Sequence, residues 1–205
     1  MFGRKKSAER SGTPADLLVV GLGNPGDKYD GTRHNVGAEV IEVLADRHGE
    51  KLKPSRQAAL SAELRFGEFR MAIAFPQTFM NHSGRSVRDL TSRFGIDDAS
   101  EIVVIHDELD LEVGTSRVKI GGGLAGHNGL KSINRHIHTQ DFVRVRIGIG
   151  RPPGSQSVSD YVLRRPGKAE RIELDIKIEK AADVVERLLR EEAESIMNDF
   201  NRRER

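Results

Sequence analysis

The feature that most constrains the fold is an apolar run at residues 17–20, which leads directly into a glycine-punctuated loop at residues 21–35. Consecutive apolar residues are typical of a strand that is buried on both faces, as in parallel sheets. Open α/β sheets bind their ligands at the carboxyl ends of such strands. The loop carries His34, a side chain suited to taking up a proton near neutral pH. The sequence therefore favours an α/β protein with its chemistry at the strand ends.

Short apolar runs alternate with helical patterns along the rest of the chain. Strands are predicted at residues 17–22, 58–66, 69–75, 102–106, 115–120 and 142–149, and helices at 36–47, 83–94, 126–137 and, as one long pattern, 168–200. Gly67-Glu68 joins two of these strands and predicts an antiparallel hairpin, whereas the intervening helices predict parallel pairs. These patterns predict a single-domain three-layer α/β sandwich with a mixed β-sheet flanked by helices.

The composition excludes several classes of protein. The 205 residues suit one domain, and residues 1–15 are predicted to be a disordered basic leader. No stretch reaches the length of a bilayer span and the start lacks an apolar signal core, so a cytoplasmic protein with no membrane partner is expected. The chain has no cysteine, which excludes disulfides, thiolate metal sites and thiol nucleophiles. A net charge of +2 does not exclude nucleic acid, because local clustering matters more.

One acid is placed to orient His34. The buried run at residues 102–106 ends directly before Asp107, and a parallel neighbouring strand would bring that acid to the edge that carries the first loop. A carboxylate that accepts a hydrogen bond from an imidazole sets its tautomer and raises its basicity. Plainer interpretations stay open: His34 as a surface or capping histidine, and Asp107 as a turn or cap acid. A loosely held Mg²⁺ near Glu108 and Asp110 is a further alternative.

Three asparagines, Asn24, Asn81 and Asn128, stand in loops at predicted strand ends or helix starts. An amide can donate to a developing oxyanion and accept from an N–H, although a single loop asparagine is more commonly a turn or cap residue. His82 is a rival base beside Asn81. The setting of His34 among amides favours His34.

Two glycine-rich segments resemble nucleotide-binding loops only weakly. Gly21-x-Gly23-x-x-Gly26 matches the dinucleotide fingerprint, but the residues after it keep the chain in a loop where the fingerprint needs a helix. The segment at residues 121–130 allows close backbone approach to an anion. It lacks the Gly-Lys-Ser/Thr ending of a phosphate loop, which argues against NTP hydrolysis.

Basic residues recur at spacings that place them on shared faces. They are Arg117 and Lys119, Arg144 and Arg146, and Lys131 and Arg135. The plain interpretation is a solvated face, and the sharper one is a phosphate-binding patch beside the active edge. With no Gly-x-Ser-x-Gly motif, the whole set indicates a base-activated water that attacks an ester or carbonyl on a polyanionic carrier.

Five segments together resemble, in family order, the signatures of bacterial peptidyl-tRNA hydrolases. They are residues 19–37, 76–84, 105–111, 119–130 and 144–152. On this resemblance, residues 16–201 are identified as a peptidyl-tRNA hydrolase-like catalytic domain. The resemblance implies hydrolysis of the ester between a peptide and the terminal ribose of tRNA. It also implies tRNA as the partner, a monomer, and no metal or organic cofactor.

The resemblance further implies the roles of individual residues. His34 matches the general base, Asp107 the acid that orients it, and Asn24 the asparagine that recognises a blocked substrate. Residues that match the family's substrate-binding positions are Tyr29, Phe79, Met80, Asn81 and Asn128. Lys119 and Arg146 match the pair that clamps the 5′-phosphate of tRNA.

The chain departs from the family pattern at Leu124-Ala125, where many members carry a polar residue and then glycine. This change is expected to alter the loop beside the substrate channel. Two other functions stay open. One is a non-catalytic RNA-binding relative, against which the intact set around His34 argues. The other is a hydrolase of small esters, which would lose little on removal of Lys119 or Arg146.

Overall fold

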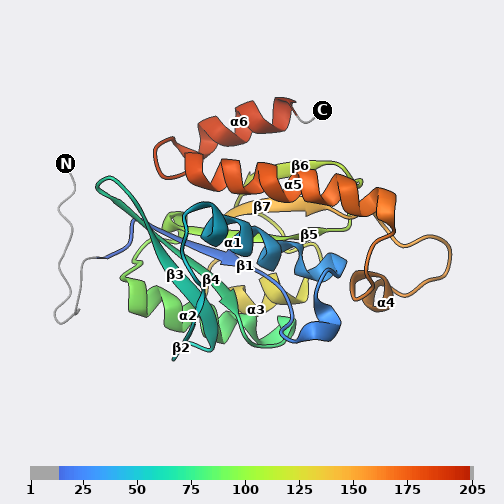
Figure 1. Cartoon of the computed structure of the whole chain (residues 1–205), viewed down its shortest axis with the longest axis horizontal. Coiled ribbons are helices and arrows are strands. Elements are labelled where there is room, and N and C mark those ends of the chain that lie inside the picture. Colours follow the sequence, from blue (N-terminus) through green and yellow to red (C-terminus); the bar gives the residue numbers. More distant parts are fainter. Residues whose placement is uncertain (1–13, 204–205) are drawn as a thin grey trace.

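The structure, a computed structural model, describes residues 14–203 and contains one seven-stranded sheet with helices on both faces (Figure 1). The strands are β1 (Leu17–Gly21), β2 (Lys53–Ser55), β3 (Ala59–Phe66), β4 (Phe69–Pro76), β5 (Ile102–Glu108), β6 (Ser116–Ile120) and β7 (Val143–Gly148), in the order β2-β3-β4-β1-β5-β7-β6. The central strands β4, β1, β5 and β7 are parallel, while β2, β3 and β6 pair antiparallel at the edges. This arrangement confirms the predicted α/β fold with a mixed sheet.

The helices divide between the two faces of the sheet. They are α1 (Val36–Arg47), α2 (Ser83–Phe94), α3 (Asn128–Ile137), α4 (Val158–Val162), α5 (Lys168–Arg187) and α6 (Ala193–Arg203). Side chains of α1, α5 and α6 pack in one apolar cluster, and those of α2 and α3 pack in a second cluster on the opposite face. Figure 1 shows α5 and α6 on one side of the sheet and α2 and α3 on the other. Three layers result, as predicted.

The two clusters explain why β1 is wholly apolar. Leu17 and Val19 join the cluster under α1 and α5, whereas Leu18 and Val20 join the cluster under α2 and α3. Successive side chains of a strand point to opposite faces, so a strand covered on both faces cannot alternate with polar residues. The continuous apolar run at residues 17–20 therefore indicates a central strand that is covered on both faces.

Two glycines let α1 pack directly on the strand backbones. A Cβ on Gly21 would lie 2.1 Å from the carbonyl oxygen of Gly37, and a Cβ on Gly37 would lie 2.3 Å from that of Ile105. Neither contact is possible for a real side chain, so both positions require glycine. Gly21 therefore serves helix–strand packing, and α1 begins only at Val36, after two 3₁₀ turns. The dinucleotide interpretation fails, because no α-helix starts within the glycine motif, and α1 begins ten residues after Gly26.

The predicted long helix at residues 168–200 is wrong. The chain forms two helices, α5 and α6, separated by residues 188–192. This connection contains neither glycine nor proline, and both helices bury their apolar faces in the same cluster. The hydrophobic pattern therefore runs on across the break. The short elements β2 and α4 were not predicted.

The described residues begin close to the boundary between the predicted leader and the predicted domain. Residues 1–13 of the predicted leader lie outside the described residues, and their disorder stays a prediction. Ala15, however, is buried, and its N–H donates to the carbonyl of Phe94 at 2.9 Å. Within residues 14–203, no helix combines the length and apolar composition that a membrane span requires.

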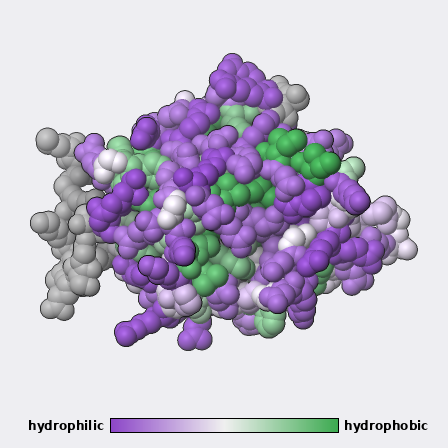
Figure 2. Space-filling view, viewed as in Figure 1, coloured by the Kyte–Doolittle hydropathy of each residue, from purple (hydrophilic) through white to green (hydrophobic). Residues whose placement is uncertain are grey.

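The face of the molecule shown in Figure 2 is mostly hydrophilic, with hydrophobic residues in a few separate patches, one of them over α5. Large hydrophobic side chains are exposed at five described positions: Phe79, Val158, Leu163, Ile172 and Ile176. Ile172 and Ile176 belong to α5. The other three border the groove described next.

Candidate active site

The carboxyl ends of β1, β4 and β5 open into one groove with a volume of about 830 Å³. Parallel strands bring their following loops to the same edge of a sheet, so distant sequence segments meet there. The groove is lined by eight of the residues singled out in the sequence: Asn24, Tyr29, His34, Phe79, Met80, Asn81, Asp107 and Asn128. The structure thus brings together side chains from three strand ends and the start of α3.

His34 and Asp107 form a directly bonded pair. The Nδ1 atom of His34 lies 2.8 Å from Oδ1 of Asp107, and the carboxylate is almost fully buried. Burial lowers the pKa of His34, but the charge of Asp107 and this hydrogen bond outweigh burial, so the pKa is raised above 6.5. No group of residues 14–203 hydrogen-bonds to Nε2 of His34. The ring therefore offers Nε2 to the groove as a proton acceptor.

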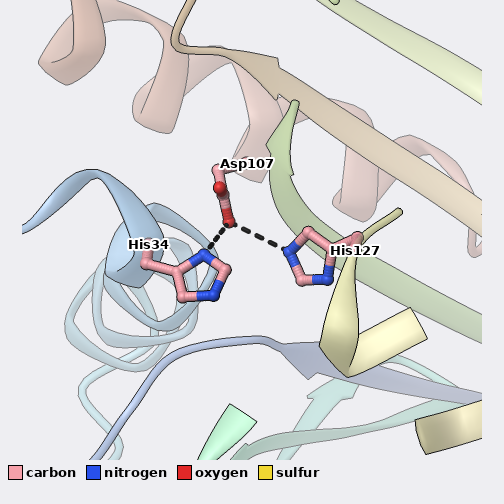
Figure 3. A group of neighbouring side chains, drawn as sticks. All are labelled: His34, Asp107 and His127. Carbon is pink, nitrogen blue, oxygen red and sulfur yellow. Dashed lines mark hydrogen bonds and ion pairs between the residues drawn. The ribbon is translucent and has the colours of Figure 1, made fainter. Parts of the chain in front are cut away.

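The sequence missed a second imidazole on the same carboxylate oxygen. Nε2 of His127 lies 3.1 Å from Oδ1 of Asp107, opposite His34 (Figure 3). Nδ1 of His127 accepts the backbone N–H groups of Gly129 and Leu130 at the start of α3. Because those groups can only donate, Nδ1 carries no hydrogen, and Nε2 must donate to Asp107. Both nitrogens of His127 are occupied, which excludes it as a general base in this arrangement.

The carboxylate between the two rings stays ionised. Burial raises the pKa of Asp107, but the interactions with His34 and His127 outweigh burial and hold the pKa well below its ordinary value. A buried carboxylate with two N–H donors is an efficient orienting group for an imidazole. The sequence pattern did not connect His127 with Asp107. The signal that could have identified it is its position in the first turn of the predicted helix at residues 126–137, directly before Asn128.

The other histidines near the strand ends do not compete with His34. Burial, followed by the neighbouring His127, lowers the pKa of His106 to about 3. Its Nδ1 donates to the backbone carbonyl of Asp107 at 2.7 Å, and its ring packs edge-on against His127. His82, the rival base in the sequence, is exposed and does not line the groove.

The three groups His34, Asp107 and His127 also lie close enough together to suggest a metal site, with ligand atoms within 4.8 Å of one another. A histidine that binds a metal through Nε2 carries its hydrogen on Nδ1. In His127 that hydrogen would point at the N–H groups of Gly129 and Leu130. The donor set therefore fits a hydrogen-bonded cluster and not a metal centre.

The amide of Asn24 has a defined orientation. Its Oδ1 accepts the backbone N–H of Met80 at 2.8 Å, so the remaining donor of this groove-lining side chain is Nδ2. Asn35 holds the backbone of Asn24 from both sides, with two hydrogen bonds of 2.9 Å. These hydrogen bonds fix the loop after β1 to the turn after β4 at the groove.

Aromatic and amide side chains form the rest of the near wall. Tyr29 and Phe79 meet edge to face with ring centroids 6.4 Å apart, and Phe79 is 55% exposed. Asn81 and Asn128 are exposed at the groove, whereas Met80 is buried. Exposed aromatic surface next to free amides suits a ligand that has both a flat face and peptide groups.

The predicted basic patch divides into two parts. Lys119 pairs with Arg144, and Arg117 with Arg146, across the antiparallel β6–β7 ladder, so all four share one face. Arg144 is buried and donates to the carbonyls of Gly122 and Gly123, so it holds the glycine-rich turn. Its inclusion in a phosphate-binding patch is therefore wrong.

Arg146 and Lys119 lie outside the groove lining but differ from Arg144 in exposure. Both are partly exposed. Nε of Arg146 donates to Oε2 of Glu108 at 3.0 Å, and Glu108 lines the groove. The Arg146 guanidinium therefore lies beside the groove with part of its donor set free of Glu108.

Leu124 and Ala125, where the sequence departs from the family pattern, lie in the turn before α3. Leu124 packs against the apolar cluster under α2 and α3. Ala125 has a φ of 47°, in the left-handed region that favours glycine, at a cost of about 1 kcal/mol. An apolar anchor and a strained residue thus stand where the glycine-rich turn meets the groove.

The sequence also did not reveal one wall of the groove, which is formed by α4. Val158, Ser159 and Val162 of α4, together with Leu163, line it. Three of the five exposed large hydrophobic residues therefore border this groove: Phe79, Val158 and Leu163. Exposed apolar surface gathered around a concave site is typical of a binding site.

The fold and this site define an α/β enzyme with a histidine–aspartate pair arranged for general-base hydrolysis. Comparisons with known proteins agree. Residues 18–205 match the family model described as peptidyl-tRNA hydrolase. The chain belongs to the peptidyl-tRNA hydrolase family.

Individual relatives cover nearly the whole chain. A peptidyl-tRNA hydrolase of Frankia alni is 48% identical over 184 residues, which are 90% of this chain and 93% of the relative. One of Cutibacterium acnes is 45% identical over 90% of this chain and 97% of the relative. The crystal structure of peptidyl-tRNA hydrolase from Acinetobacter baumannii matches with a TM-score of 0.84 and 38% identity, covering 93% of this chain and 97% of that one.

Proposed function

We propose that the chain hydrolyses the ester bond between peptide and tRNA in peptidyl-tRNA and releases free tRNA. Family membership supports the substrate. The observation that carries the chemistry is the His34–Asp107 pair, in which Nδ1 is bonded to the carboxylate and Nε2 is left for a water molecule in the groove. A base with its pKa raised above 6.5 suits proton abstraction near neutral pH.

The reaction follows from these positions. Nε2 of His34 takes a proton from water, whose oxygen attacks the ester carbonyl carbon, and Asp107 stabilises the resulting imidazolium. The carbonyl oxygen becomes an oxyanion. When the ester C–O bond breaks, the imidazolium returns its proton to the ribose oxygen, which leaves with the tRNA. The peptide keeps the new carboxyl group.

The groove's amides and apolar side chains are proposed to bind the substrate. The Nδ2 group of Asn24 donates to the peptide-like group of a blocked substrate, and Asn81 and Asn128 position the peptide and the water. Tyr29, Phe79 and Met80 form the wall for the terminal nucleotide and the adjoining peptide. The Tyr29–Phe79 contact supports a stacking surface for a base.

Lys119 and Arg146 are proposed to bind the 5′-phosphate of tRNA. Their shared face on β6 and β7, and the location of Arg146 beside the groove residue Glu108, support this role. Two cations suit a doubly charged terminal phosphate. The monomeric state and the cytoplasmic location expected from the sequence stay predictions.

The first test compares an N-acetylaminoacyl-tRNA with the unblocked aminoacyl-tRNA, using the wild type and His34→Ala. We expect rapid hydrolysis of the blocked ester only, and loss of that hydrolysis in the variant. A wild type that binds tRNA without cleaving the ester would support the non-catalytic RNA-binding function instead.

A second test separates a tRNA hydrolase from a hydrolase of small esters. Lys119→Ala and Arg146→Ala should each raise KM for the tRNA substrate and lower the salt slope of binding by about 1. Lys51→Ala is the matched control, because Lys51 is exposed and precedes the opposite edge strand, β2. An unchanged KM and salt slope in both variants would refute phosphate binding by this pair.

A further inference from the structure

Arg33 directly precedes His34, yet its side chain does not line the groove. It is only 7% exposed, and its guanidinium faces α5 and α4. Nε and one terminal nitrogen donate to the two carboxylate oxygens of Glu170 at 2.6 and 2.5 Å. This two-pronged geometry is the most specific that an arginine and a carboxylate can form.

The same guanidinium holds the segment that contains α4. Its other terminal nitrogen donates to the carbonyls of Tyr161 and Arg164 at 3.3 and 3.0 Å, and its Cζ atom lies over the Tyr161 ring, 4.2 Å from the ring centre. Arg165 adds a hydrogen bond of 2.8 Å to the carbonyl of Asp30, in the loop that leads to His34. Figure 1 shows α4 at the end of the molecule where this loop lies.

The position of α4 matters because this helix forms an apolar wall of the groove. Val158 is 46% exposed and Leu163 is 37% exposed, and both line the groove that His34 also lines. A helix of five residues is too short to be stable without tertiary contacts. Tyr161 and Val162 pack in the apolar core, and Arg33 adds further contacts from the residue adjacent to the base.

We propose that Arg33 and Glu170 are a positioning pair that sets the α4 wall at a defined distance from His34. The inference rests on the proposed function, in which the groove holds the peptide next to the ester. The α4 wall would then favour substrates in which the amino acid esterified to the tRNA carries an apolar side chain. The pair acts on substrate binding and not on the base, since Asp107 orients His34 through separate atoms.

The test uses Glu170→Gln, which weakens the pair from the α5 side and leaves the His34 loop unchanged. The matched control is Glu39→Gln, because Arg171 and Glu39 form the same kind of two-pronged pair between α5 and α1, away from the groove. Substrates are N-acetylleucyl and N-acetylglycyl esters of the same tRNA body. Arg33→Lys, which keeps the charge without the planar fork, is the second variant if Glu170→Gln folds poorly.

We expect KM for the leucyl substrate to rise about tenfold in Glu170→Gln, with a smaller change for the glycyl substrate. The pH midpoint of kcat should not move, and Glu39→Gln should keep both KM values. Equal KM changes for the two substrates, or a lower Tm with unchanged KM, would overturn the proposal by reducing the pair to a structural contact. A shifted pH midpoint would mean that the pair acts through His34. A wild type that cleaves neither ester would instead refute the proposed function and remove the basis of this inference.

Discussion

His34, in the turn after β1, and His127, at the start of α3, contact the same oxygen of Asp107 but differ in their second nitrogen. His34 keeps Nε2 open to the groove, whereas His127 uses Nδ1 to cap α3. The same residue type with the same acid partner is thus a base in one place and a support in the other. An imidazole's chemical role depends on what occupies its other nitrogen, which the distance to the acid alone does not reveal.

The groups around His34 are held in place by hydrogen bonds of their own. His127 joins Asp107 to the first turn of α3, and the side chain of Asn35 holds the backbone of Asn24. The carboxylate is therefore held before any substrate binds. A preorganised acceptor lowers the reorganisation needed when His34 becomes charged.

Replacing His34 is expected to have the largest effect. His34→Ala removes the only imidazole nitrogen of the cluster that is open to the groove, so kcat should fall by about 10²- to 10⁴-fold while tRNA binding is kept. Single-turnover hydrolysis and a separate tRNA-binding assay measure the two quantities. Substantial turnover in this variant would show that another histidine is the base.

Asp107→Asn should have the next largest effect. In the wild type the raised pKa of His34 predicts that kcat/KM rises with pH through a midpoint above 6.5, because the base must be neutral. Without the negative charge, burial dominates, so the pKa of His34 falls and the midpoint moves to lower pH. The plateau rate should drop by at least about tenfold, since the base is weaker and its tautomer is no longer set. A pH profile that matches the wild type would exclude the orienting role.

Replacing His127 tests its supporting role in two ways, because the free energy of unfolding reports the cap of α3 and kcat reports the contact to Asp107. His127→Ala removes the cap of α3 and should lower the free energy of unfolding by about 1 kcal/mol, whereas His127→Asn keeps a capping side chain and should lower it less. Both variants lose the contact to Asp107, so kcat should fall by about tenfold or less. Urea unfolding and initial rates measure the two effects. A rate loss as large as that of His34→Ala would break the assignment of roles.

The smallest expected effect is on the pH dependence of stability. Because the folded pKa of His34 is raised, the His34–Asp107 pair stabilises the fold fully below the unfolded pKa and loses this contribution as pH rises through the folded pKa. The difference in unfolding free energy between the wild type and His34→Ala should therefore shrink from pH 6 to pH 9. A difference that grows with pH would contradict the sign of the shift.

Much of the fold was predictable because its signals are local. The bounds of α1 coincide with the predicted ones, because the hydrophobic spacing indicates them, and α2 ends at Phe94, directly before Gly95, as predicted. Ser83, the expected cap of the second helix, is instead its first helical residue. The hairpin followed from Gly67-Glu68, which the structure places between β3 and β4. The break between α5 and α6 was missed, because its residues are acceptable in a helix and only packing separates the two.

The candidate site was predictable in its residue types and less so in its connections. Strand order alone brought the loop of His34, the turn after β4 and Asp107 to one edge, as the sequence predicted. The sequence did not reveal the role of His127, because its position alone cannot show whether the side chain also contacts a carboxylate from a distant strand. It also did not reveal that Arg144 is buried, since alternation along β7 cannot show which face the glycine-rich turn covers.

The sequence by itself determined the periodic elements, the buried central strands, the glycines required for close packing and the set of residues available for catalysis, because these depend on neighbours along the chain. The tertiary structure decided which nitrogen of each histidine is free, which arginine is structural, and how α4 is held against the groove. These outcomes depend on hydrogen bonds between residues far apart in the sequence, such as Arg33 and Glu170, and only the folded chain sets those distances.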